Sequence, residues 1–221
     1  GETEKQVYSF QKGKNNLALR FDLTVPFARY VAQYYNDLVF PFKRYQIGKV
    51  YRGERNQKGR YREFYQCDID VIGKEKLSIN NDAWVINLAD KAFKEIGLSN
   101  YRFQISNRKV LKGILTELEI DNQADVMILI DKIDKIGEEV FISELKNLIG
   151  IDKSEYLNKI LKLDGSNDEK LEELSKLDIK NEYYNEGVEE LKKVKSLLEI
   201  LGVDKENFEI KRIRLLYRNC I

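Results

Sequence analysis

The stretch VYRGERNQKGRYREFYQCDIDVIG, Val50 to Gly73, decides the fold of this 221-residue chain. It belongs to two β-prone runs, Phe42 to Tyr51 and Glu63 to Ile72, which are joined by a short polar loop. Aromatic and branched residues are frequent in both runs, and the second run alternates between two kinds of side chain, as strands with two different faces do. The pattern predicts two strands that form an antiparallel hairpin.

One face of the second strand is polar. Strand alternation places Phe64, Gln66, Asp68 and Asp70 on the same side. A row of acidic and amide groups is costly to bury in an ordinary core, so this face is expected to line a cleft or to meet water. A solvated, salt-bridged surface is the plainer interpretation. We favour a ligand site, because arginine guanidinium groups, an aromatic ring and an amide occur together on this one hairpin.

The residue types of the hairpin suit a nucleotide and an amino acid. Arg52, Arg60 and Arg62 carry planar, permanently charged groups that match phosphate oxygens. Phe64 offers a flat apolar surface for a base, which makes an adenine nucleotide the expected ligand. Gln66 and Asp70 lie two pleats apart and are able to receive a small ligand with N–H donors, such as an amino acid with its ammonium group.

Two segments resemble one known family. LRFDLTVPFARY (Leu19 to Tyr30) and KRYQIGKVYRGERNQKGRYREFYQCDIDVIG (Lys43 to Gly73) are similar to the core of the histidyl-tRNA synthetases, the second being similar to motif 2 of class II synthetases. Gly1 to Phe10 and Leu98 to Leu118 resemble adjoining parts of that core. The resemblance implies an α+β fold, in which a class II synthetase-like antiparallel β-sheet is flanked by helices and carries an α-helical insertion domain.

The expected domain organisation has three parts. Residues 1–107 form a partial class II catalytic core that includes motif 2, residues 108–202 form the helical insertion, and residues 203–221 return to the core. The middle part is charged, Leu/Ile-periodic and nearly free of aromatic residues, which is typical of amphipathic helices. Gly137, Gly150 and the run 164–168 are expected to separate these helices. A helix over Asn80 to Ile96 is expected to cover the sheet.

The resemblance also implies a role for each site residue. Arg52 matches the catalytic arginine that holds the ATP α-phosphate and the histidine carboxylate. The histidine-binding residues are Asp22, Thr24, Gln66 and Asp70. The ATP-binding residues are Arg52, Glu54, Arg60, Arg62 and Phe64. Arg55 and Gln57 stand where the family meets the tRNA acceptor end, no metal ligand is assigned, and Trp84 stands where the family usually has glutamate.

The implied function is that of a histidine–tRNA ligase. Such an enzyme activates histidine with ATP to histidyl-adenylate and transfers it to its tRNA, with ATP and Mg²⁺ as the substrate complex. The expected partners are histidine, ATP and the tRNA acceptor end, the intact parent is expected to be a homodimer, and no membrane is involved. Two alternatives stay open: a histidine-sensing regulatory subunit of ATP phosphoribosyltransferase, and a synthetase-like domain that binds tRNA without catalysis.

Composition excludes several classes of protein. The chain has a net charge of +1, so RNA contact is expected only from a local patch such as the arm from Lys49 to Arg62. It contains no histidine, which excludes a Ser-His-Asp triad and histidine metal ligands within it. Two cysteines, Cys67 and Cys220, lack metal-site spacing and suit a reducing cytoplasm. No signal-like or membrane-spanning run is visible.

The last residues depart from the family. Lys211 to Ile221 reads KRIRLLYRNCI, where the family has an Arg-Gly-Leu-Asp-Tyr-Tyr-Thr-Gly run. With suitable codons from Arg212 onward, a shift of one base restores most of that run, so we expect a frameshifted or mis-sequenced gene end; a natural, basic, divergent tail is the alternative. The chain also lacks motif 1, motif 3 and an anticodon-binding domain. It is therefore expected to be a fragment that does not charge tRNA alone.

Overall fold

The structure is a computed structural model that describes residues 4–55 and 58–211. The chain divides into two compact units between Asn81 and Asp82. The elements of the first unit are η1 (Glu4–Gln6), β1 (Ser9–Lys12), β2 (Asn15–Ala18), α1 (Thr24–Gln33), β3 (Phe42–Tyr51) and β4 (Glu63–Ile72). Helix α2 (Asn80–Glu95) begins just before this division and lies mostly in the second unit. The domain boundaries expected at residues 107 and 202 stay predictions.

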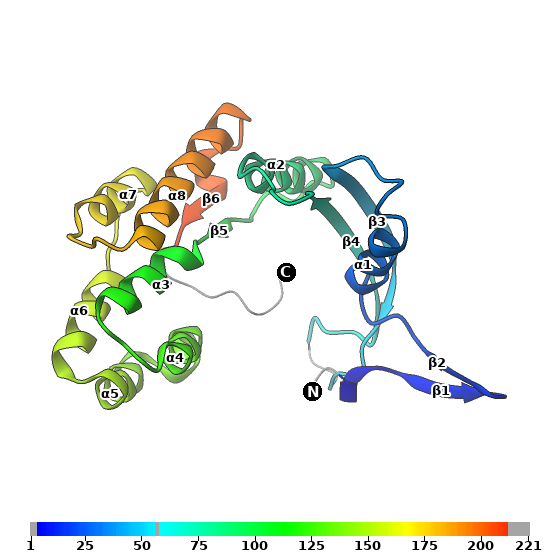
Figure 1. Cartoon of the computed structure of the whole chain (residues 1–221), viewed down its shortest axis with the longest axis horizontal. Coiled ribbons are helices and arrows are strands. Elements are labelled where there is room, and N and C mark those ends of the chain that lie inside the picture. The colour runs from blue at the N-terminus through cyan, green and yellow to red at the C-terminus, as the bar shows by residue number, and fades with distance from the viewer. Residues whose placement is uncertain (1–3, 56–57, 212–221) are drawn as a thin grey trace. The chain divides into compact units, whose positions relative to one another are not determined.

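The elements of the second unit are mostly helical (Figure 1). They are β5 (Phe103–Ile105), α3 (Arg108–Glu117), α4 (Gln123–Ile136), α5 (Glu138–Ile149), α6 (Ile151–Leu161), α7 (Asn167–Lys176), α8 (Glu182–Ile200), η2 (Lys205–Asn207) and β6 (Phe208–Ile210). The mixture of strands and helices confirms the predicted α+β class.

The hairpin β3–β4 confirms the prediction from strand alternation. The two strands have the predicted bounds and pair antiparallel over their full length, with Arg44 opposite Asp70 and Gly48 opposite Gln66. Alternation then assigns Arg44, Gly48, Gln66 and Asp70 to one face. The other face carries Tyr45 and exposed neighbours such as Ile47 and Tyr65. The polar face is therefore the more shielded of the two.

Helix α1 packs on the polar face of the hairpin. A hydrogen bond fixes its first turn, and the spacing of its buried residues places them on one side of the helix. The N–H of Val25 donates to the carboxylate of Asp22 at 2.8 Å, which satisfies one of the free donors of the helix start. Phe27 and Val31, four residues apart, are buried on one side of the helix. The ring of Phe27 stacks on Phe42 of β3 at 5.9 Å between centroids. The turn before α1 is thereby held against the hairpin.

The second unit is built around a core of helix side chains. The largest contribution comes from α3 and α8, which approach closely at Gly113, where an added Cβ would lie 2.6 Å from the Cβ of Tyr184. The fully buried members of the core include Val110, Ile114, Phe141, Leu145, Leu157, Leu174 and Leu198. Strands β5 and β6 pair parallel, which sequence analysis did not predict.

Two expectations for the helices were wrong in part. Helix α7 was missed, because the run 164–168 suggested only a break; Ser166 and Glu169 form a capping box that starts this helix. Helix α2 ends at Glu95, one residue before the predicted end at Ile96, and Ile96 is exposed, while the expected cover of the sheet by α2 stays a prediction. The buried positions of α2 include Asn87 and Asp90.

Asp90 is buried because three groups donate to it. The hydroxyl of Tyr101 donates to its carboxylate at 2.7 Å, Lys94 lies 2.9 Å away, and the amide of Asn207 donates at 3.2 Å. Burial alone would raise the pKa of this carboxyl, and the hydrogen bonds outweigh it, so the pKa lies below its ordinary value. These hydrogen bonds explain why a charged residue is buried in α2.

Candidate active site

The candidate site lies on the polar face of β3–β4, beside the turn that precedes α1. Gly48 lies close to that turn, since a Cβ at this position would lie 3.2 Å from Nη1 of Arg20 and 3.6 Å from a methyl group of Leu23. The absent side chain leaves room for the segment from Arg20 to Leu23 across the hairpin. That segment is also fixed at its start, since the N–H of Tyr51 donates to the carbonyl of Arg20 at 2.8 Å.

Arg52 lies where the turn and the hairpin meet. Its Nε donates to the carbonyl of Phe21 at 3.3 Å, and its Nη2 donates to the side-chain oxygen of Gln66 at 3.4 Å. The guanidinium carbon is 4.9 Å from the ring centroid of Phe21 and 5.1 Å from that of Phe64. Two aromatic rings and two hydrogen bonds therefore hold this cation beside a ring expected to meet a base.

Gln66 continues the polar row along β4. While its oxygen accepts from Arg52, its amide nitrogen donates to Oδ1 of Asp68 at 2.7 Å. Asp68 was recognised as part of the polar face but was given no site role in the sequence analysis. The structure makes it the carboxylate that orients Gln66, and with it the contact to Arg52.

Arg44 also contributes to the candidate site, although the sequence analysis did not single it out. Its Nε and Nη2 both lie 2.9 Å from Oδ2 of Asp70. Nη2 also donates to the carbonyl of Leu23 at 3.0 Å, and Nη1 donates to Gln46. Leu23 stands between Asp22 and Thr24, so Arg44 joins the turn that carries those two residues to the strand that carries Asp70. The available signal was its position on the polar face.

The two residues of the turn differ in their surroundings. Asp22 is partly buried and its carboxylate accepts from the N–H of Val25 at 2.8 Å, whereas Thr24 is exposed at the start of α1. Contacts from Arg52 to Phe21 and from Arg44 to Leu23 place this turn and the polar face together. The roles assigned to Asp22, Thr24, Gln66 and Asp70 stay predictions.

The loop residues form a separate group at the end of the hairpin. Nη1 of Arg60 lies 3.2 Å from the carboxylate of Glu54, and Nε of Arg62 donates to the carbonyl of Glu54 at 3.4 Å. Arg55 is exposed, and Gln57 lies outside the described residues. The base of the loop is anchored, because the N–H of Gly53 donates to the carbonyl of Gln6 at 2.7 Å. An added Cβ at Gly53 would come within 3.1 Å of that same oxygen.

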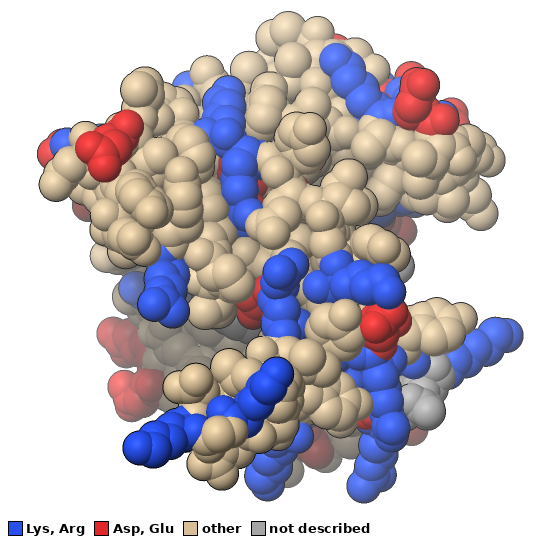
Figure 2. All heavy atoms as spheres, turned by 90° about the vertical axis from the view of Figure 1, so that its right-hand side faces the viewer, with Lys and Arg blue, Asp and Glu red and all other residues tan. Residues whose placement is uncertain are grey.

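Charge is distributed unevenly along the chain. Residues 1–81 contain 15 Lys and Arg but 9 Asp and Glu, so the net charge of +1 hides a basic first unit. Basic side chains are prominent on the face of the molecule shown in Figure 2. A positive potential over this unit favours polyanionic ligands. Residues 49–62 hold six of these Lys and Arg and one of the acidic residues, so most of the excess positive charge lies in the arm from Lys49 to Arg62.

Comparison with known proteins identifies the family. A family model described as histidyl-tRNA synthetase matches residues 1–214. The chain belongs to the histidyl-tRNA synthetase family. A histidine–tRNA ligase from Clostridium acetobutylicum is 59% identical over 210 residues, which are 95% of this chain and 49% of the relative. One from Finegoldia magna is 51% identical over 211 residues, with the same shares of the two chains.

Solved structures of histidyl-tRNA synthetases agree with the fold. The crystal structure of the histidyl-tRNA synthetase from Nostoc sp. PCC 7120 matches with a TM-score of 0.83 and 37% identity, covering 93% of this chain and 48% of that one. An ATP phosphoribosyltransferase regulatory subunit/histidyl-tRNA synthetase from Bacillus halodurans C matches with a TM-score of 0.77 at 24% identity, which shows the fold alone. The chain spans about half the length of the curated relatives it matches.

Membership of this family is what the sequence resemblance implied. Within residues 4–55 and 58–211, no helix is both long and apolar enough to cross a bilayer. The same part of the chain contains no cluster of three or more acidic or cysteine side chains arranged to hold a metal ion.

Proposed function

We propose that residues 19–73 form the part of a histidine–tRNA ligase active site that binds histidine and the adenine nucleotide. The observation that carries the proposal is the way Arg52 uses its hydrogen-bond donors. Its contacts with Phe21 and Gln66 use two of the five N–H donors of a guanidinium, within the part of the chain that is described. Arg52 is thus held in place and still has donors to offer to an anion, as a preorganised phosphate-binding group requires.

The proposed reaction begins with histidine and ATP. A carboxylate oxygen of histidine attacks the α-phosphorus of ATP, a new O–P bond forms, and the bond to the pyrophosphate oxygen breaks. A hydroxyl oxygen of the terminal adenosine of the tRNA then attacks the acyl carbon of histidyl-adenylate, an ester bond forms, the bond to the phosphate oxygen breaks, and AMP leaves. Negative charge gathers on the α-phosphoryl oxygens during the first step, and Arg52 is the cation placed to stabilise it. Mg²⁺ arrives with ATP as part of the substrate complex.

The remaining residues are proposed to orient the substrates. The histidine-binding set is Asp22, Thr24, Gln66 and Asp70, and the ATP-binding set is Arg52, Glu54, Arg60, Arg62 and Phe64. Carboxylates and amides suit the ammonium group of an amino acid, which carries only donors. The ring of Phe64 suits adenine because a flat apolar surface stacks on any base. Arg55 and Gln57 are proposed to meet the tRNA acceptor end.

The proposal extends to the partners of the complete enzyme. The basic first unit supports binding of the tRNA acceptor end, because phosphodiester groups are attracted to a surplus of lysine and arginine. Homodimer formation and a cytoplasmic location are proposed from the family and the ligase relatives. Inactivity of the 221-residue chain by itself stays a prediction; the sequence from Arg212 to Ile221 on which it rests lies outside the described residues.

A histidine sensor is the second candidate, because an ATP phosphoribosyltransferase regulatory subunit/histidyl-tRNA synthetase has a similar fold. Such a sensor binds histidine without forming an adenylate. The ligase names of relatives that are 59% and 51% identical support the enzyme instead. The two functions differ in one measurable property, which is exchange of pyrophosphate into ATP.

The experiment replaces a segment of the Clostridium acetobutylicum ligase with the part of this chain that aligns with it. Pyrophosphate exchange is then measured with each amino acid in turn. The proposed function predicts exchange that depends on histidine and not on the other amino acids. Histidine binding without exchange would favour the sensor, and exchange that is insensitive to histidine would contradict both candidates.

A further inference from the structure

Arg44 and Arg52 lie on the same hairpin but make different use of their donors. All three guanidinium nitrogens of Arg44 contact protein oxygens, on Asp70, Gln46 and the backbone of Leu23. Arg52 keeps donors for a ligand, as described above. The contacts of Arg44 engage four of its five N–H donors, so this guanidinium is suited to fix its neighbours rather than to bind a substrate.

The surroundings of Arg44 make its position well defined. The side chain is 15% exposed and that of Asp70 is 22% exposed, so the ion pair is largely shielded from water. The guanidinium carbon lies 3.7 Å from the centroid of the buried Phe27 ring in α1. Shielding strengthens both the ion pair and the cation–π contact relative to an exposed pair. One side chain therefore connects α1, the turn before it and both strands of the hairpin.

The contact with Asp70 has a direction. Both nitrogens of Arg44 meet Oδ2 of this carboxylate, and Oδ1 is the oxygen that the ion pair does not use. The ion pair thus holds one oxygen of the carboxylate and leaves the other without a contact to Arg44. Arg44 also offsets part of the negative charge that Asp68 and Asp70 place on one face.

We propose that Arg44 is a positioning residue of the histidine pocket. It holds the carboxylate of Asp70 and the Asp22–Thr24 turn in one arrangement, so that their oxygens receive the donors of histidine together. This inference rests on the proposed function, because it gives Asp70 and the turn the role of histidine binding. ATP binding is expected to depend less on Arg44, since the partners of Arg44 are Asp70, Gln46 and Leu23, none of which belongs to the proposed ATP-binding set.

The first test uses the Clostridium acetobutylicum chimera in pyrophosphate exchange. Arg44→Gln is expected to raise KM for histidine about tenfold or more, the usual effect of losing hydrogen bonds to a charged group, while KM for ATP changes less than about twofold. Arg44→Lys keeps the charge but not the planar fork, so it should restore part of the affinity for histidine. Equal increases in both KM values, or no change in either, would overturn the proposal.

A matched control lies on the opposite face of the same hairpin. Ile47 is 63% exposed on that face and has no assigned role. Ile47→Gln introduces the same residue into the same strand as Arg44→Gln does, so both KM values should stay within about twofold of the unsubstituted chimera. A rise in KM for histidine equal to that of Arg44→Gln would show a general effect on the hairpin and would overturn the assignment.

A double-mutant cycle in the 221-residue chain tests whether Arg44 and Asp70 interact. It does not require enzymatic activity. Urea unfolding is measured for Arg44→Gln, Asp70→Asn and the double variant. If Arg44 acts on Asp70, the double variant is less destabilised than the sum of the single ones. Additive effects would overturn the positioning role. If the unsubstituted chimera shows no histidine-dependent exchange, the proposed function fails, and this cycle alone decides whether Arg44 holds Asp70.

Discussion

Substitution of Asn167 should weaken the attachment of helix α7 to strand β6. Asn167 is the first residue of α7, and its side chain pairs with the backbone of β6 as a neighbouring strand would. Its Oδ1 accepts from the N–H of Ile210 at 2.8 Å, and its Nδ2 donates to the carbonyl of Phe208 at 3.2 Å. Both strand residues are buried, at 1% and 2% exposure. Water therefore replaces the amide poorly.

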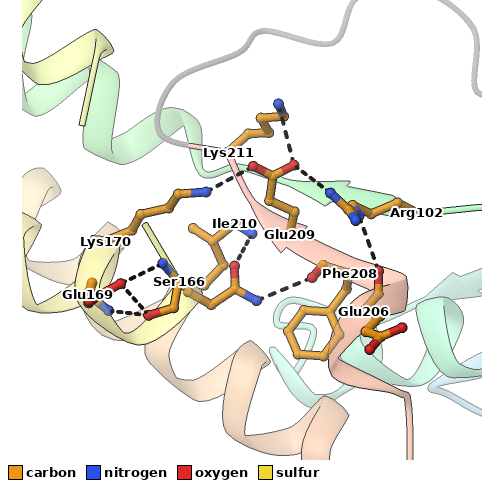
Figure 3. A network of polar contacts seen from close by, with 10 residues as sticks. Arg102, Ser166, Glu169, Lys170, Glu206, Phe208, Glu209, Ile210 and Lys211 are labelled. Carbon is orange, nitrogen blue, oxygen red and sulfur yellow. Dashed lines mark hydrogen bonds and ion pairs between the residues drawn. The ribbon is translucent and has the colours of Figure 1, made fainter. Parts of the chain in front are cut away.

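The expected cost of Asn167→Ala follows from these contacts. The substitution leaves one buried donor and one buried acceptor without a partner, at about 1–3 kcal/mol each. Alanine recovers about 0.5 kcal/mol through its higher helix propensity. The neighbouring ion pair between the buried Lys170 and Glu209 stays in place and limits the local opening (Figure 3). We expect a net loss of about 2–4 kcal/mol in the free energy of unfolding.

Urea unfolding followed by far-ultraviolet circular dichroism measures this loss, because most helices belong to residues 82–221. Asn147→Ala is the control, since Asn147 is exposed in α5 and its removal should change the free energy of unfolding by less than about 0.5 kcal/mol. A loss below about 0.5 kcal/mol for Asn167→Ala would refute the reasoning. Unchanged amide hydrogen exchange at Ile210 would refute it independently.

Gly113→Ala should destabilise the chain by about 1–2 kcal/mol, because the added methyl overlaps Tyr184 and this outweighs the gain in helix propensity; a higher urea midpoint would contradict the close approach of α3 and α8. Hydrogen bonds from Lys94 and Tyr101 keep the pKa of Asp90 below its unfolded value, so its contribution to stability is present above about pH 4 and is lost as the pH falls further. The stability advantage over Asp90→Asn should therefore shrink below about pH 4, and an advantage that grows in acid would contradict the assignment. The purified 221-residue chain is expected to show no histidine-dependent pyrophosphate exchange, and a clear signal with histidine alone would prove this wrong.

Local patterns were sufficient for the part of the fold that carries the site. The bounds and the antiparallel pairing of β3 and β4 followed from alternation on each side of a short polar loop, because the hairpin is a local structure. Helix α7 was detectable in principle, since Ser166 and Glu169 form the capping-box spacing. The pairing of β5 with β6 was not, because two three-residue strands about a hundred residues apart leave no periodic signal.

The residues of the candidate site could be predicted from their types, but the contacts between them could not. Arg52, Gln66 and Asp70 stood out because polar groups on one strand face demand an explanation. Arg44 did not stand out, since its meaning depends on the carbonyl of Leu23 and on the Phe27 ring, which only the folded chain brings near. Backbone carbonyls leave no trace in a sequence, so residues that position a site are harder to find than residues that line it.

The most direct test of the central claim is pyrophosphate exchange by Arg52→Ala in the Clostridium acetobutylicum chimera, with Arg29→Ala as the control. Arg29 is exposed on α1, so the control removes an arginine from the same unit without touching the candidate site. Loss of one preorganised donor to the developing phosphoryl charge should lower histidine-dependent exchange about a hundredfold or more, while the control stays within about twofold. Exchange by Arg52→Ala within about threefold of the unsubstituted chimera would contradict the proposed role of Arg52 and the active site built around it.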